Sequence, residues 1–90
     1  MITHYDITVE GKVQGVFYRA STKEKATQLD IKGFVKNQAD GTVFIAAEGS
    51  PVQLDQLIAW CRQGPPRAMV KNVQFQAGMV KGYERFEVKH

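Results

Sequence analysis

Hydrophobic and polar residues alternate at the start of the chain. In the stretch HYDITVE, Tyr5, Ile7 and Val9 fall on one side, while His4 and the other polar residues fall on the opposite side. This period of two is typical of a β-strand that buries one face. Beyond it the spacing changes, and the apolar positions of residues 18–29 recur at helical intervals. A strand followed by a helix is therefore expected.

Residues 33–49, GFVKNQADGTVFIAAEG, indicate a β-hairpin. Alternating apolar residues mark a strand on each side of a polar centre, with Val43 and Ile45 on one face of the second strand. Between the strands, Asp40 and Gly41 are expected to supply the positive φ angles that a tight turn needs.

A second helix has the clearest start in the chain. Ser50 suits the N-cap, Pro51 suits the first helical position, and Gln53 completes a Ser-x-x-Gln capping box. Apolar residues then keep helical spacing until Gly64, where the helix is expected to stop.

Two strands are expected in the rest of the chain, in AMVKNVQFQA and, as a short extra C-terminal strand, in ERFEVK. The order strand, helix, strand, strand, helix, strand is the split βαβ pattern (βαββαβ) of the ferredoxin-like α+β fold. Its two helices lie on one face of a mostly antiparallel sheet. The length suits a single domain over residues 1–90. Many functions use this architecture, so function has to be argued from a site.

Composition favours small anionic ligands. The net charge is +3, from 12 basic and 9 acidic residues that are scattered along the chain. The single cysteine, Cys61, permits no intrachain disulfide, and MITHYDITVE lacks the pattern of a secretory signal. No apolar run approaches the ~20 residues that span a bilayer. A cytoplasmic location and no membrane partner are therefore expected.

Arg19 is an unusual residue for the first turn of a helix, where the helix dipole already places partial positive charge. In this fold the first two strands run parallel and end at one edge of the sheet, roughly 10 Å apart at ~4.8 Å per strand. Asn37 lies at the end of the second strand. Backbone amides of the glycine-containing turn and the helix start can bind an anion that also fits the arginine fork. The residues therefore predict a site for a small tetrahedral anion.

Two blocks of sequence resemble the acylphosphatase family. GKVQGVFYR, residues 11–19, resembles the signature Gly-x-Val-Gln-Gly-Val-x-Phe-Arg, and GFVKNQADGTV, residues 33–43, resembles Gly-x-Val-x-Asn-x-x-Asp-Gly-x-Val. GPPRA, residues 64–68, also looks like the family's segment after the second helix. Tyr18 departs from the usual Phe, and Asp30 stands where the family often has Gly, which affects stability if that position is left-handed.

The resemblance implies a stand-alone enzyme that hydrolyses acyl phosphates to a carboxylate and inorganic phosphate. It implies that Arg19 binds the phosphoryl group and that Asn37 positions the attacking water. It also implies a phosphate cradle made by the backbone amides of one loop, which comprises Gln14, Gly15, Val16, Phe17, Tyr18 and Arg19. For Gln14, the backbone rather than the side-chain amide is expected to contact the ligand.

The residues of the two blocks suit a reaction without metal, cofactor or covalent intermediate. The blocks contain no His or Cys and no carboxylate cluster for Mg²⁺. Outside them, His4, His90 and Cys61 show no metal-ligand spacing. Such a site stabilises charge and orients water but supplies little proton transfer, which suits a carboxylate leaving group. Phosphate and sulfate are expected to compete with the substrate, and the protein is expected to be a monomer.

Two other functions stay open from the sequence. KGFV, residues 32–35, faintly resembles the start of an RNA-recognition motif, but it lies on the second strand rather than the third, where only Phe44 could stack on a base. We therefore expect no nucleic-acid partner. The other alternative is an acylphosphatase-like accessory domain that handles carbamoyl phosphate within a larger enzyme. The physiological acyl phosphate does not follow from the sequence.

Overall fold

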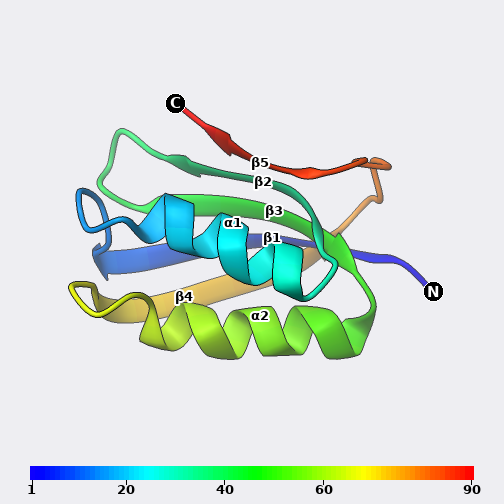
Figure 1. The fold of residues 1–90 in the computed structure, drawn as a ribbon, viewed down its shortest axis with the longest axis horizontal. Helices are drawn as coiled ribbons and strands as arrows, with labels where there is room; N and C mark the ends of the chain where they lie inside the picture. Colours follow the sequence, from blue (N-terminus) through cyan, green and yellow to red (C-terminus); the bar gives the residue numbers. More distant parts are fainter.

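The computed structural model describes residues 1–90. Its elements are β1 (Thr3–Lys12), α1 (Tyr18–Gln28), β2 (Lys32–Asn37), β3 (Val43–Gly49), α2 (Pro51–Gln63), β4 (Met69–Gly78) and β5 (Phe86–Lys89). Both helices lie against the same face of one sheet (Figure 1). The ferredoxin-like α+β fold predicted from the sequence, with its short extra C-terminal strand, is confirmed.

The sheet has the strand order β4-β1-β3-β2-β5. β3 is antiparallel to both β1 and β2, which therefore run parallel to each other, and β5 pairs in parallel with β2. Val43, at the start of β3, pairs with Val9 on one side and Asn37 on the other. The ends of β1 and β2 thus meet at one edge of the sheet, as the crossover topology requires.

The core lies between the sheet and the helices. Ile7 and Val9 of β1 and Ile45 of β3 are fully buried, and Leu54 and Leu57 of α2 cover them from the other layer. This is the face that the alternation of β1 and the helical spacing of α2 predict.

The capping box of α2 is confirmed. The Ser50 hydroxyl accepts a hydrogen bond from the Gln53 amide at 3.2 Å, and the Gln53 side chain accepts one from the Ser50 amide at 2.8 Å. The two bonds satisfy amides that a helix start otherwise leaves free.

The prediction for the β2–β3 turn was wrong for Asp40. Of the pair, only Gly41 has a positive φ, at 93°. The carboxylate of Asp40 instead accepts hydrogen bonds from the backbone amide and the hydroxyl of Thr42, at 3.0 and 2.6 Å. This side-chain turn shapes the loop without a left-handed Asp. Asp30, by contrast, does adopt a left-handed conformation with φ of 58°.

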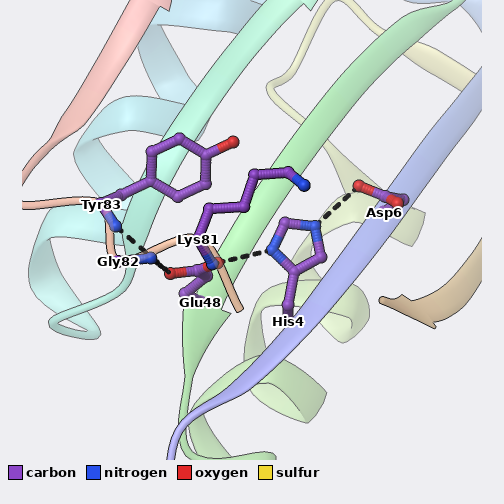
Figure 2. A network of polar contacts seen from close by, with 6 residues as sticks. All are labelled: His4, Asp6, Glu48, Lys81, Gly82 and Tyr83. Atoms are coloured by element: carbon purple, nitrogen blue, oxygen red, sulfur yellow. Dashed lines mark hydrogen bonds and ion pairs between the residues drawn. The ribbon is translucent and has the colours of Figure 1, made fainter. Parts of the chain in front are cut away.

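His4 lies on the face of β1 opposite the core, as its place in the alternation predicts, yet only 1% of it is exposed. Its ring lies between the carboxylates of Asp6 and Glu48 (Figure 2). Glu48 of β3 also accepts hydrogen bonds from three backbone amides of the segment that joins β4 to β5, those of Lys81, Gly82 and Tyr83. These hydrogen bonds hold the segment that joins β4 to β5 against β3, just before the chain enters β5.

Candidate functional site

A hollow of about 280 Å³ lies where β1 and β2 end. Its walls come from the loop after β1, the first turn of α1, the end of β2 and the end of β5. Of the residues that the sequence singles out, it is lined by Gly15, Phe17, Tyr18, Arg19 and Asn37. The two candidate catalytic residues, Arg19 and Asn37, therefore face one shared space.

The loop between β1 and α1 turns through two left-handed residues. Gly15 has φ of 73°, and Phe17, the N-cap of α1, has φ of 65° and ψ of 22°. No side chain caps this helix start, and no acidic residue lies in its first turn. The first amides of a helix have no intrahelical acceptor, so those of α1 remain available to an anion at the hollow.

Arg19 is held at the hollow by the end of the chain. One of its terminal nitrogens, Nη1, donates to the carbonyl oxygen of Lys89 at 3.0 Å and lies 3.2 Å from Nδ1 of His90. The guanidinium has further N–H donors that bond no protein acceptor. β5 therefore orients the cation while leaving donors for a ligand. The sequence pattern predicts β5 as a strand but does not indicate this contact, which joins residues 70 positions apart.

Asn37 carries an unpaired acceptor. Its side-chain oxygen Oδ1 is buried and accepts no hydrogen bond from the protein. Buried polar atoms are nearly always paired, and leaving one unpaired costs about 1–3 kcal/mol. Asn37 also lines the hollow, which makes a water or ligand hydroxyl there the candidate partner for this oxygen.

The side chain of Gln14 does not line the hollow. Its amide nitrogen Nε2 donates to the carbonyl oxygens of Gln38 and Thr42 at 2.8 and 2.9 Å. The side chain thus ties the loop after β1 to the loop after β2, and so ties the two candidate catalytic residues to each other. Val16 belongs to the core and is 5% exposed, so it too can offer an anion only its backbone.

The side chain of Tyr18 anchors α1 to α2 through its hydroxyl, which is therefore not free. Its hydroxyl donates to the carbonyl oxygen of Cys61 in α2 at 2.8 Å, and the residue is 1% exposed. Burial raises the pKa of the Tyr18 phenol, which therefore stays protonated. Burial also raises the pKa of the Cys61 thiol to about 12. Neither group can act as a nucleophile near neutral pH.

The structure shows neither a metal-binding cluster nor a membrane-spanning helix. No group of three or more His, Cys, Asp and Glu side chains is placed to hold a metal ion. None of the helices combines the length and the apolar character that a membrane span requires.

Comparison with known proteins assigns the family. The sequence model of the acylphosphatase family matches residues 5–88. An acylphosphatase of Marinobacter nauticus is 52% identical over 75 residues, which cover 83% of this chain and 82% of that protein.

Solved structures agree with this assignment. The structure of an acylphosphatase from Coxiella burnetii superposes with a TM-score of 0.95 at 41% identity, covering 98% of this chain and 93% of that one. HypF from T. kodakarensis superposes with a TM-score of 0.86 at 27% identity, and 98% of this chain covers only 12% of that protein. The chain belongs to the acylphosphatase family, whose members are enzymes that hydrolyse acyl phosphates to a carboxylate and inorganic phosphate.

Proposed function

We propose that Arg19 and Asn37 carry out acyl phosphate hydrolysis in the hollow between β1 and β2. The observation that carries this proposal is that Arg19 lines the same hollow as Asn37, whose side-chain oxygen is buried and unpaired. A cation from the first turn of α1 and a free acceptor from the end of β2 suit a phosphoryl group and the water that attacks it.

Arg19 binds the phosphoryl oxygens together with backbone amides of residues 14–19. The cation and the first amides of α1 both favour negative charge, and an arginine fork matches two phosphate oxygens. The contact from β5 to Arg19 holds the fork in place before the substrate arrives. Such preorganised donors stabilise the charge that develops as the bond to phosphorus breaks.

Asn37 accepts a hydrogen bond from the attacking water through Oδ1. This bond aims the water oxygen at phosphorus, and the bond between phosphorus and the acyl oxygen breaks. The leaving carboxylate is already a stable anion, so no general acid is required. The water proton passes to an oxygen of the substrate's own phosphate group.

The reaction needs no metal in this proposal, because the guanidinium and the amides supply the positive charge. The test is release of phosphate from benzoyl phosphate before and after treatment with EDTA. Unchanged rates are expected. Activity that disappears with EDTA and returns with Mg²⁺ would contradict the metal-free reaction.

Separate variants distinguish the two residues. Arg19→Ala should weaken phosphate binding and lower kcat, by roughly 10³–10⁵ if the arginine acts mainly in the transition state. Asn37→Ala should spare phosphate binding and lower kcat by roughly 10²–10³, since water is positioned for the chemical step. Steady-state kinetics, phosphate inhibition and thermal melting of both variants provide the measurement.

Matched controls are available on the surface. Arg62→Ala removes an exposed arginine of α2, and Asn72→Ala removes an exposed asparagine of β4. Both should retain the original kinetics. Near-normal turnover in a folded Asn37→Ala protein would refute the water-positioning role. Loss of phosphate affinity with intact kcat in that variant would instead place Asn37 in the cradle.

The open face of the sheet does not favour nucleic acid as a partner. Phe34 and Phe44, the aromatic residues of β2 and β3, lie with ring centroids 5.9 Å apart. The ammonium group of Lys89 lies 4.2 Å from the centroid of the Phe34 ring and occupies the surface on which a base would stack.

We propose a monomer that acts on small acyl phosphates, with phosphate and sulfate as competing anions. We also propose a cytoplasmic location, which suits the free, buried thiol of Cys61.

A further inference from the structure

Phe17 combines two unfavourable features at the rim of the hollow. Its backbone is left-handed, with φ of 65°, a conformation that glycine or asparagine adopts far more readily than phenylalanine. Its side chain is 72% exposed, so the ring gains little from burial. A residue chosen only for the turn would be small or polar, so the ring itself requires an explanation.

The protein offers no internal role for this ring. The Phe17 side chain does not cap α1. The stacked and tilted aromatic pairs of the protein join other rings, among them Tyr18 with Trp60. The flanking residues Val16 and Tyr18 both point into the core, whereas Phe17 between them is exposed. Strained backbone that persists in this way is typical of ligand sites.

The hollow is large enough for more than a phosphate group. Its volume of about 280 Å³ approaches the lower end of the ~300–1,000 Å³ typical of small-molecule sites. Its lining combines the polar residues Arg19 and Asn37 with apolar residues, among them Phe17 and the half-buried Val88 of β5. A substrate whose phosphate is held by Arg19 would leave its acyl group beside these apolar side chains.

We propose that the Phe17 ring binds the acyl group of the substrate and gives the enzyme a preference for acyl phosphates with an aromatic or bulky apolar acyl group. The inference rests on the proposed placement of the phosphate at Arg19. An aromatic or branched acyl group would cover the exposed ring, whereas an acetyl or carbamoyl group is too small to do so. Aromatic contacts favour offset or edge-to-face packing, which an exposed ring at a rim permits.

The test compares benzoyl phosphate with acetyl phosphate in the full chain. For the unaltered protein, kcat/KM is expected to be higher for benzoyl phosphate. Phe17→Ala removes the ring and leaves a residue with a similar backbone preference, so the ratio of the two kcat/KM values should fall by roughly 3–10-fold, the size of one aromatic contact. Phe17→Leu keeps an apolar side chain and should give an intermediate ratio.

Phe75→Ala is the matched control, because it removes another exposed phenyl ring that lies on β4 outside the hollow. Its ratio should equal that of the unaltered protein, and thermal melting verifies that each variant is folded. If Phe17→Ala lowers kcat/KM for both substrates by the same factor, or leaves the ratio unchanged, the ring does not bind the acyl group. Failure of the unaltered protein to hydrolyse either substrate would overturn the proposed function itself, and this inference with it.

Discussion

The buried imidazole of His4 binds the carboxylate of Glu48 across β1 and β3 at 2.7 Å, and its other nitrogen binds Asp6 at 2.8 Å. Ionised carboxylates only accept hydrogen bonds, so this geometry favours the protonated ring, in which both nitrogens donate. Burial alone would lower the pKa of His4, but the bonds and charges of Asp6 and Glu48 outweigh it and raise that pKa above 6.5. The stability of the fold should therefore depend on pH through His4 and its two carboxylate partners.

The first prediction concerns this pH dependence. A raised histidine pKa contributes stability that is complete below about pH 6.5 and is lost as pH rises through the folded-state pKa. Burial raises the pKa of Glu48, but three backbone amides and His4 lower it below 4.5 overall. The Glu48 contribution is complete above about pH 4.5 and is lost on acidification. The network should stabilise most between these limits.

Urea unfolding at pH 6 and pH 9 measures the effect. The unaltered protein should lose free energy of unfolding between these values, by about 1.5–3 kcal/mol if one charged hydrogen bond is lost. His4→Gln should be less stable at pH 6 and should lose much less on going to pH 9. An identical loss in the variant and the unaltered protein would show that His4 is not the titrating group.

The second prediction is that phosphate and sulfate stabilise the folded chain, because the cradle binds a tetrahedral anion. At one hundred times the dissociation constant, the stabilisation should be about 2.7 kcal/mol. Thermal melting in phosphate, sulfate and chloride at matched ionic strength separates binding from general salt effects. Arg19→Ala should lose most of the shift. An equal shift in chloride would argue against a specific cradle.

The third prediction concerns Gln14, whose two hydrogen bonds link the loop that precedes Arg19 to the loop that follows Asn37. Gln14→Ala should lower the free energy of unfolding by about 1–3 kcal/mol, as expected for two partly buried hydrogen bonds. It should also lower kcat more than it weakens phosphate inhibition, because water alignment depends on the distance between the loops.

Gln38→Ala provides the comparison for Gln14. The Gln38 side chain bonds the Thr42 hydroxyl within a single loop, at 2.8 Å, and does not connect the two loops. Its variant should show a smaller loss of kcat. Equal kinetic effects in the two variants would mean that the loop itself, rather than the link between loops, controls turnover.

The fourth prediction is a stabilising substitution at Asp30, which is left-handed with φ of 58°. Asp30→Gly should relieve about 1 kcal/mol of backbone strain, since non-glycine residues disfavour this region. It also removes the ion pair with Lys32, whose exposed geometry contributes little. The melting temperature should rise slightly, and turnover should not change.

Thr27→Gly serves as the opposing control for Asp30. Thr27 is exposed and helical, so glycine there should lower the stability by a few tenths of a kcal/mol, the difference between the helix propensities of threonine and glycine. Lower melting temperatures in both variants would show that the strain at Asp30 is offset elsewhere.

The local patterns of the sequence determined the elements and their buried faces. The alternation of Ile7 and Val9 in β1 and the capping box at Ser50 depend only on neighbours along the chain, and both are present in the structure. The Asp40-Gly41 pair marked the loop correctly but not its backbone, because a carboxylate can replace a left-handed residue in shaping a turn. Arg19 and Asn37 could be placed at one sheet edge because the order of strands and helices fixes which strand ends are neighbours.

The tertiary structure alone decided the contacts between residues far apart in the chain. Three such features depend on strand register and on the path of the segment that joins β4 to β5. They are the hydrogen bond from Arg19 to β5, the link from Gln14 to the β2–β3 loop, and the burial of His4. The oxygen of Asn37 is likewise unpaired because no neighbouring residue places a hydrogen-bond donor next to it. Periodicity reports which side of an element is apolar, but hydrogen bonds form between atoms within about 3 Å, and such distances are set only when all the elements have packed.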